Sequence, residues 1–326
     1  MSDFEKKRAV RRIACGLAVI AAIGALLIAS SALVYPKNNQ QAFGMNNEAA
    51  NGVLGERNGS IDVLFIGDSE AFSSFSPLQM WDEHGFTSYV CAIPSQQLTY
   101  GNTLLHRATR NQSPRVVVIE TNTIYAPFTA NDALLRVLQD MFPVFEFHDR
   151  WKALNAGDLS LDVSATWSDD LKGFRINRDV KAADASGYMA PDSRVQEIPQ
   201  LNRAYLESMV LYCRSIGAEP VLVSTPSTVN WNMPRHNGIQ AFASQTGVSY
   251  IDLNAEPTKI DIDWKNETRD GGDHLNLSGA QKVSDYIGEH LATSYGLPDH
   301  RGDDAFSSWN DCSKRYGQRI SETGSL

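Results

Sequence analysis

The sequence predicts an α/β fold, a doubly wound and mostly parallel sheet flanked by helices, preceded by one membrane-spanning helix. Short apolar runs alternate with segments of helical periodicity along most of the chain, a pattern typical of a parallel sheet covered on both faces. Residues 13–34 form an uncharged, mostly apolar run that follows a cluster of lysines and arginines. These two observations divide the chain into an anchor and a folded domain.

The anchor is predicted from the length of the apolar run. At 1.5 Å per residue, a helix over residues 13–34 spans about 33 Å, close to the thickness of a bilayer core. The basic residues within 1–12 favour a cytoplasmic N-terminus and place the rest of the chain outside the membrane. A cleaved signal peptide is the alternative, because Ser30, Ser31 and Ala32 are small. The run is longer than an ordinary signal core, so we expect a retained single-pass anchor at the cell membrane.

The elements of the domain follow in order. Residues 35–57 are polar and rich in Gly and Asn, without a sustained period, which predicts a tether. The domain itself is expected over residues 58–295. Strands are predicted at residues 61–66, 87–92, 116–120, 220–224 and 249–252. Helices are predicted at residues 77–83, 100–109, 201–216, 236–246 and from Ser278, which is available as N-cap.

Two segments depart from this alternation. Residues 125–200 are irregular and aromatic, which predicts a cap insert at the carboxyl edge of the sheet. The insert either shapes a substrate groove or only completes the hydrophobic core, and the sequence leaves both readings open. Residues 296–326 are polar, so we expect a loosely held tail.

Two motifs at opposite ends of the domain suggest a serine acyl-transfer site. Gly67-Asp68-Ser69 follows the first predicted strand, and Asp270-Gly271-Gly272-Asp273-His274 precedes the last predicted helix. A serine in such a turn exposes both its hydroxyl and its backbone N–H, and a histidine with a nearby carboxylate is the base that such a nucleophile needs. We therefore predict Ser69 as nucleophile and His274 as general base. The N–H of Ser69 would stabilise the oxyanion.

Other polar residues follow neighbouring strands at the same edge. Gln96 follows the second strand and is a further candidate oxyanion donor, and such a donor contributes about 3 kcal/mol in known sites. Trp231, His236 and Asn237 follow the fourth strand, where they are candidates for binding an acceptor sugar.

The composition excludes some functions. The chain has a formal net charge of −9, and much of its basic charge lies beside the anchor, so the domain is more acidic still. This argues against nucleic acid as a partner and against binding to anionic headgroups. No Cys-x-x-Cys spacing indicates zinc or a redox pair. Asp68 and Glu70 flank the nucleophile, where we expect them to bond to nearby backbone or solvent and not to a metal. We predict no metal and no cofactor.

Strand-Gly-Asp-Ser, then Glu120-Thr121-Asn122, then Asp-x-x-Asp-His-Leu-Asn together resemble the SGNH (GDSL-like) hydrolase superfamily over nearly the whole domain. The resemblance implies a flavodoxin-like three-layer sandwich and assigns Asn122 as a further oxyanion donor, although the family's Gly-x-Asn-Asp is absent here. The family acid lies three residues before the histidine, where this chain has Gly271. Asp270 fits if the two glycines bulge by one residue, and Asp273 is the alternative.

The anchor, the segment Ile61–Glu70 and the segment His274–Ala280 further resemble anchored proteins that modify cell-envelope polymers. These include the teichoic-acid D-alanylation protein and the acetyltransferases of peptidoglycan and alginate. The resemblance implies acyl transfer outside the membrane, with a membrane-bound O-acyltransferase as donor partner and a polysaccharide or teichoic acid as acceptor. Two alternatives stay open: an esterase or deacetylase of envelope polysaccharide, and a protein that binds a polysaccharide or an acyltransferase without chemistry.

Overall fold

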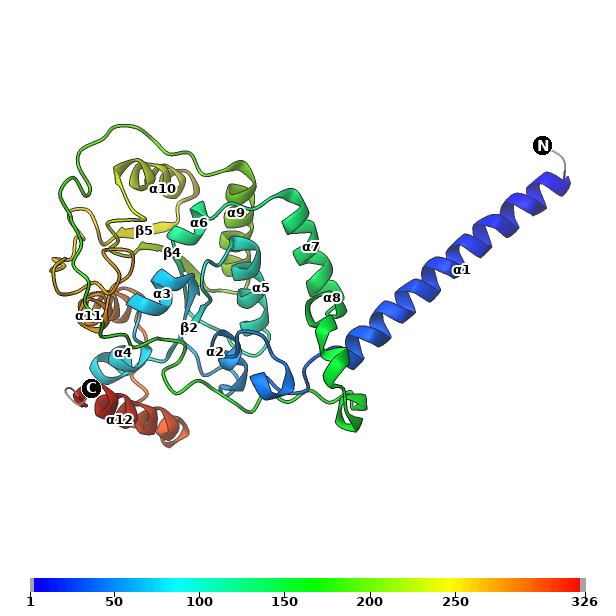
Figure 1. Ribbon diagram of the computed structural model, residues 1–326, viewed down its shortest axis with the longest axis horizontal. Coiled ribbons are helices and arrows are strands. Elements are labelled where there is room, and N and C mark those ends of the chain that lie inside the picture. Colours follow the sequence, from blue (N-terminus) through cyan, green and yellow to red (C-terminus); the bar gives the residue numbers. More distant parts are fainter. Residues whose placement is uncertain (1–2, 323–326) are drawn as a thin grey trace.

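A five-stranded parallel sheet forms the centre of the domain (Figure 1). The structure is a computed structural model that describes residues 3–322. The strands follow the order β2-β1-β3-β4-β5 across the sheet, and every neighbouring pair is parallel. They are β1 (Val63–Gly67), β2 (Ser88–Ala92), β3 (Val116–Glu120), β4 (Glu219–Ser224) and β5 (Ser249–Asp252). Each predicted strand is confirmed: β1, β2 and β3 are buried along their whole length, and β4 and β5 are buried towards their carboxyl ends.

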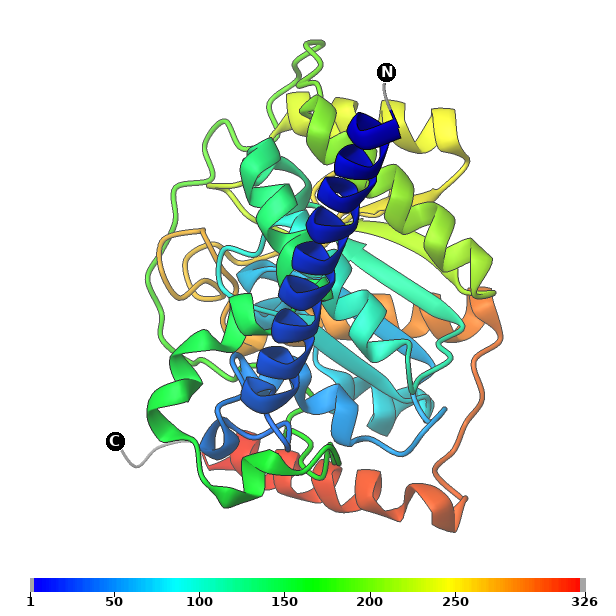
Figure 2. The ribbon, with the colours of Figure 1, turned by 90° about the vertical axis from the view of Figure 1, so that its right-hand side faces the viewer.

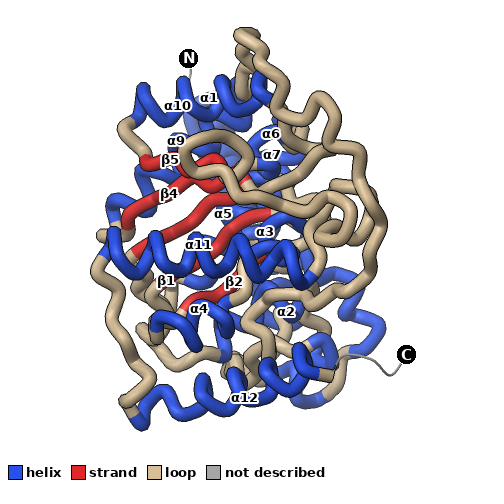
Figure 3. The backbone as a smooth tube through the Cα atoms, turned by 90° about the vertical axis from the view of Figure 1, so that its left-hand side faces the viewer, coloured by secondary structure: helices blue, strands red, loops and turns tan. Residues whose placement is uncertain are grey.

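Helices cover both faces of the sheet, as expected for a doubly wound fold. Alternate residues of a strand point to opposite faces, so Leu64 and Ile66 join one core cluster and Val63 and Phe65 join the other. The first face is covered by α5 (Leu98–Ala108), α9 (Gln200–Ser215) and α10 (Met233–Thr246). The second face is covered by α3 (Ser69–Ser74), α4 (Pro77–His84) and α11 (Leu277–Tyr295), and Figure 3 shows α11 lying across the strands.

The start of α11 differs slightly from the expectation. Asn276, and not Ser278, caps the helix, because the Asn276 side chain accepts hydrogen bonds from the N–H groups of Ser278 and Gly279. The predicted apolar stripe is confirmed: Ala280, Val283, Ile287 and Leu291 are fully buried at helical spacing.

Residues 35–57 are not the free tether that their composition predicts. They form two short 3-10 helices, Gln41–Phe43 and Gly52–Gly55, with α2 (Glu48–Asn51) between them. Ala50 and Val53 are buried in the main core cluster. The buried Asn39 side chain also donates to the carbonyl of Trp167 at 2.6 Å. This segment therefore fixes the long N-terminal helix α1 (Asp3–Val34) to the domain, and α1 alone is long and apolar enough among the described helices to cross a membrane.

The insert of residues 125–200 has two parts. The first is helical: α6 (Asn122–Tyr125), α7 (Ala130–Met141), α8 (Val144–Phe147) and two 3-10 helices, His148–Ala153 and Ala156–Leu159. The second is irregular and runs along the sheet. There the Val90 N–H of edge strand β2 donates to the Lys172 carbonyl, and the Lys181 N–H donates to Thr268 beside the loop before α11. Buried Phe174 joins the core, so the insert both completes the core and borders the carboxyl edge.

The C-terminal segment is not loosely held over its described part. After a 3-10 helix at Asp304–Phe306, residues Ser307–Ser321 form α12, which packs against α4. Its buried residues are Trp309, Cys312 and Tyr316 at helical spacing. The Trp309 ring contacts that of Trp81 in a tilted arrangement, with 5.4 Å between ring centroids. The expectation failed because three buried side chains on one face suffice to dock an otherwise polar helix.

Replacing Trp309 by Ala is expected to lower the free energy of unfolding by about 3–5 kcal/mol, because it leaves a cavity between α12 and α4. Chemical denaturation of the full chain in detergent, followed by far-UV circular dichroism, measures this change. The matched control is Trp151→Ala, since Trp151 is exposed and its loss should stay within about 0.5 kcal/mol. Equal stability of the two variants would show that α12 does not contribute to the fold.

Candidate active site

Ser69 lies at the carboxyl edge of the sheet, where the chain leaves β1 and enters α3. β1 is flanked by β2 on one side and β3 on the other, so this edge is the point where the winding of the sheet reverses, a usual place for a binding site. Asp68 caps α3 through a 2.9 Å bond from the Glu70 N–H to its side chain. Ser69 is the first residue of the helix, so its own N–H has no acceptor within the helix.

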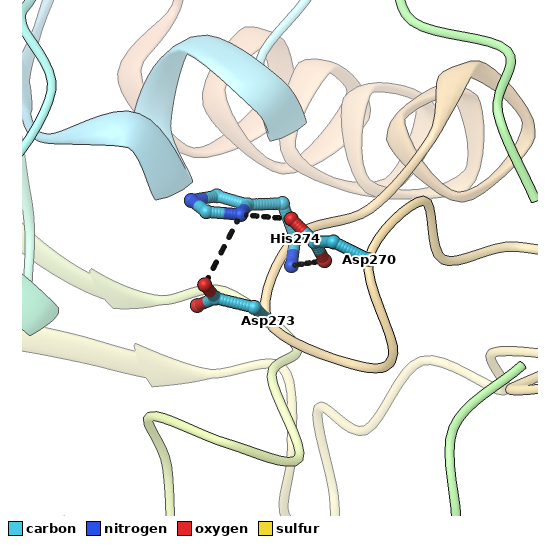
Figure 4. A group of neighbouring side chains, drawn as sticks. All are labelled: Asp270, Asp273 and His274. Carbon is cyan, nitrogen blue, oxygen red and sulfur yellow. Dashed lines mark hydrogen bonds and ion pairs between the residues drawn. The ribbon is translucent and has the colours of Figure 1, made fainter. Parts of the chain in front are cut away.

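His274 faces Ser69 from the loop before α11. Its Nε2 lies 2.7 Å from Ser69 Oγ, and its Nδ1 lies 2.6 Å from Asp270 Oδ2. The His274 backbone N–H also donates to Asp270 Oδ1 at 2.8 Å, so the carboxylate holds both the ring and the main chain (Figure 4). The structure thus brings together Ser69, His274 and Asp270, in the order that the motifs predict.

The two glycines shape the loop that holds Asp270. Gly271 and Gly272 have φ values of 89° and 94°, in the region that favours glycine, and they form the bulge that the spacing requires. A Cβ on Gly272 would lie 1.9 Å from Thr228 Oγ1. The loop after β4 holds it in place: the Thr228 N–H donates to the Gly272 carbonyl, and Ser227 Oγ donates to the Asp273 carbonyl at 2.9 Å.

Asp273 lies farther from the His274 ring than Asp270 does. Its Oδ2 lies 3.5 Å from His274 Nδ1, and its Oδ1 accepts a 2.6 Å bond from the Asn230 amide (Figure 4 shows both carboxylates near the same ring nitrogen). Partial burial favours the neutral form of Asp270, but hydrogen bonds from His274 and the nearby charges of His274 and Arg269 outweigh it and lower the pKa of Asp270. Asp270 is therefore the ionised partner that orients the ring.

The same three residues have the spacing of a metal site. Ligand-type atoms of Asp270, Asp273 and His274 all lie within 4.8 Å of one another. A metal ion there would compete with the Asp270 hydrogen bond for His274 Nδ1, while Nε2 would still face Ser69.

The predicted oxyanion donors occupy different positions. The Asn122 amide, at the start of α6 after β3, donates to Asp68 Oδ2 at 2.8 Å and accepts from Arg235, so it lies beside the nucleophile's turn. The Gln96 side chain is buried and accepts from the Ile93 N–H. Its amide nitrogen lies against α5. The structure thus places the Asn122 side chain against Asp68, the residue before Ser69. The Gln96 side chain instead bonds within the loop that carries it.

Three buried carboxyl groups lie behind the nucleophile. Glu70 is 1% exposed, and burial together with the negative charges of Glu120 and Asp68 raises its pKa well above the usual range. Burial and the charge of Asp68 likewise raise the pKa of Glu120. Burial also raises the pKa of Asp68 despite bonds from the Glu70 N–H and Asn122. This side of Ser69 is therefore acidic and shielded from solvent.

Trp231, His236 and Asn237 are engaged away from Ser69. Trp231 Nε1 and His236 Nδ1 both bond to Asp252 Oδ2 at the end of β5, at 3.0 and 2.6 Å. The Asn237 amide donates to the carbonyls of Asp192 and Arg194 in the insert. The structure does not bring these three side chains to the hydroxyl of Ser69, because each is bound to a neighbouring segment of the domain.

Asn230 and Arg235 also lie at the site, although neither is among the residues predicted for it. The Asn230 amide donates to both Glu70 Oε1, at 2.8 Å, and Asp273 Oδ1, so it joins the turn after β1 to the histidine loop. Arg235 bonds to Asn122 Oδ1 and to the Asn230 carbonyl. Both residues follow β4, which was the signal that could have found them, since the carboxyl ends of β1, β3 and β4 meet at one edge.

This arrangement has the parts that acyl transfer needs. A ring whose Nδ1 faces an ionised carboxylate carries its proton there, which leaves Nε2 free to accept the proton of Ser69. The free N–H at the start of α3 can then donate to the oxygen of a tetrahedral intermediate.

No family model and no curated protein matches the chain. Some solved structures are similar to it at low identity. A lipase/acylhydrolase from Enterococcus faecalis is 11% identical, with a TM-score of 0.39, over 73% of this chain and 98% of that one. An esterase from a Pseudoalteromonas species is 10% identical, with a TM-score of 0.38, over 70% and 95%. A variant of an acetyl-xylooligosaccharide esterase from Geobacillus stearmophilus is 11% identical, with a TM-score of 0.37, over 73% and 97%. Because these similarities are so low, what the site can do chemically has to be argued from the residues of this chain.

The structure predicts different roles for the two aspartates. Asp270→Asn should slow the reaction of Ser69 with a fluorophosphonate by up to about 10⁴-fold, the order of loss known when a triad acid becomes an amide. The isosteric Asp273→Asn is the control and should retain most of the rate, because Asp273 lies 3.5 Å from the ring. Rates of covalent labelling give the comparison. A loss confined to Asp273→Asn would overturn the assignment.

Glu70 should make stability depend on pH. Its raised pKa means that the folded state keeps a proton that the unfolded chain releases above about 4.5. Stability therefore falls as the pH rises through the window between the two pKa values, by up to about 1.4 kcal/mol per pH unit. Glu70→Gln should flatten this decline, whereas Glu289→Gln on the exposed side of α11 should leave it unchanged. Denaturant unfolding over a pH series gives the slope of the free energy of unfolding against pH. Identical slopes for Glu70→Gln and the parent would show that Glu70 does not keep its proton in the folded state.

Proposed function

We propose that this chain is a membrane-anchored, serine-dependent acyl-transfer enzyme of the SGNH (GDSL-like) type, with its domain outside the membrane. The observation that carries the proposal is the pair of short hydrogen bonds in which His274 Nδ1–H donates to Asp270 and the Ser69 hydroxyl donates to His274 Nε2. A histidine in an ordinary surface loop would have no reason to be held at both nitrogens between a carboxylate and a serine. The length of α1 supports the anchored location.

The mechanism follows from these contacts. Ser69 Oγ attacks the carbonyl carbon of an acyl ester while His274 Nε2 takes its proton, and Asp270 stabilises the resulting imidazolium. The oxyanion forms near the Ser69 N–H, then collapses as His274 returns the proton to the leaving alcohol, which leaves the acyl group on Ser69. In the second half, an incoming hydroxyl loses its proton to His274 and attacks the acyl-serine, and His274 returns this proton to Ser69 Oγ as the new ester leaves, which regenerates the free serine.

The finer proposal concerns the donor and the acceptor. We infer that the acceptor is a hydroxyl of a cell-envelope polysaccharide or teichoic acid, and that a membrane-bound O-acyltransferase supplies the acyl group. Support for both comes from the resemblance of the anchor and of the two motifs to envelope-modifying proteins. The tight attachment of the domain to α1 agrees with a donor inside the membrane, since it holds the site at a set position relative to the bilayer.

The direct test is covalent labelling of the full chain. Intact-mass spectrometry after incubation with a fluorophosphonate should show one adduct on the parent protein and none on Ser69→Ala or His274→Ala, with a loss of turnover on the order of 10⁴-fold or more. Ser73→Ala is the matched control, because Ser73 lies in the same helix and is buried. Labelling that persists in Ser69→Ala would refute the nucleophile. A parent protein without labelling would favour the binding-only alternative.

The acceptor separates transfer from hydrolysis. With an acetyl ester as donor, a transferase should release little free acetate until an envelope glycan with free hydroxyls is added, and the glycan should then gain acetyl groups. Rapid acetate release without any glycan or membrane partner would instead identify an esterase or deacetylase with the same residues.

A further inference from the structure

The helix α7 buries a charged side chain and exposes apolar ones, which is the reverse of an ordinary surface helix. Its one buried residue is Arg136, which is 8% exposed, whereas Leu134 and Met141 are 59% and 62% exposed. An amphipathic helix at a protein surface normally buries its apolar side. Exposed apolar side chains also follow α7 along the chain, and we call this set the apolar face: Leu134, Leu135, Val137, Met141, Phe145 and Trp151.

Charged contacts fix this orientation. Arg136 donates to Asp140 at 2.9 Å and to Glu146 at 2.6 Å, and Arg107 of α5 donates to the same Glu146 oxygen at 2.6 Å. Glu146 and both arginines are nearly buried. Rotating α7 to bury its leucines would break this network and leave charges without partners. The apolar face is therefore held outward by the fold.

The apolar face adjoins the point where α1 meets the domain. The Val144 N–H of α8 donates to Ser31 Oγ, and Arg150 donates to the Val34 carbonyl at the end of α1. Tyr35 packs edge-on against Phe147 of α8, with 5.5 Å between ring centroids. Figures 1 and 2 show α7 and α8 on the side of the domain from which α1 projects. A bilayer crossed by α1 would therefore meet this side first.

We propose that the apolar face docks on the bilayer that α1 spans, with α7 lying in the headgroup region. The continuity with α1 argues for lipid as the occupant, because the anchor brings the bilayer surface to this face in every molecule. Tryptophan is enriched at membrane–water interfaces, and Trp151 is exposed on this face. Lys152 Nζ lies 5.9 Å from the centroid of the Trp151 ring. Because the domain is acidic, anionic headgroups would not attract it. We therefore expect the contact to depend on apolar side chains and not on anionic lipid. The chain connects α7 directly to α6, which carries Asn122, so docking also orients the candidate site above the membrane.

The test uses the full chain with Cys15→Ser, in phosphatidylcholine nanodiscs that hold one chain each. The other cysteines are buried, so a bimane label can be directed to Leu134→Cys or Met141→Cys. Both labels should be quenched several-fold more by lipids brominated near the headgroup than a label at Val180→Cys. Val180 is the matched control because it is 58% exposed and lies in the irregular segment beside the start of α11, on the opposite side of the domain from α1.

The outcomes separate lipid from other occupants. Strong quenching at both α7 positions supports docking on the bilayer, and replacing the lipid by an anionic mixture should not strengthen it. Quenching no greater than at Val180 overturns the proposal. Labels that are open to water in single-chain nanodiscs but shielded at high protein density would assign the face to a second copy of the chain and would equally overturn it. Circular dichroism of each labelled chain verifies that it is folded.

Discussion

The packing of α3 against α11 sets the distance on which the candidate site depends. Ser69 begins α3 and His274 lies just before α11, so the hydrogen bond between them joins two motifs that are far apart along the chain. The buried Ser284 of α11 ties these helices together, because its hydroxyl donates to the Ser74 carbonyl and accepts from the Ser76 N–H. Both helices rest on the same face of the sheet. A shift of either helix by a small fraction of its diameter would separate nucleophile and base.

The buried carboxyl groups behind Ser69 lower the stability of the fold, but their hydrogen bonds help to fix the geometry of the site. Asp68, Glu70 and Glu120 are buried close together, which is unfavourable unless some of them stay protonated. Amide groups compensate in part, since Asn122 donates to Asp68 and Asn230 donates to Glu70. Asn230 also bonds to Asp273 in the histidine loop, so the same network that satisfies the buried acids connects the two halves of the site. Local stability is commonly sacrificed in this way where function requires a particular geometry.

Helix α1 and the domain form one continuous structure. The segment after α1 is packed into the core and does not act as a loose tether, and α8 contacts the end of α1 directly. The domain is thereby restricted in how it can face a membrane crossed by α1. An apolar environment outside α7 would remove the cost of exposing its leucines to water, while the nearly buried side chains of Arg136 and Glu146 hold the helix in this orientation.

The sequence by itself determined the five strands, the main flanking helices and the pairing of Ser69 with His274. The strand and helix signals are local, because they depend on the spacing of apolar residues within a short segment. Ser69 and His274 were paired by their two motifs at opposite ends of the domain. The sequence failed for α12, whose three anchoring side chains are diluted by polar neighbours, and it did not foresee α7, whose apolar face is not buried by the chain. Only the tertiary structure decided between Asp270 and Asp273, because the choice depends on the positive φ of Gly271 and Gly272 and on the loop after β4. It also directed Trp231 and His236 to Asp252 and gave Asn230 its partners, because a position after β4 does not determine which side chains of other segments a residue will contact.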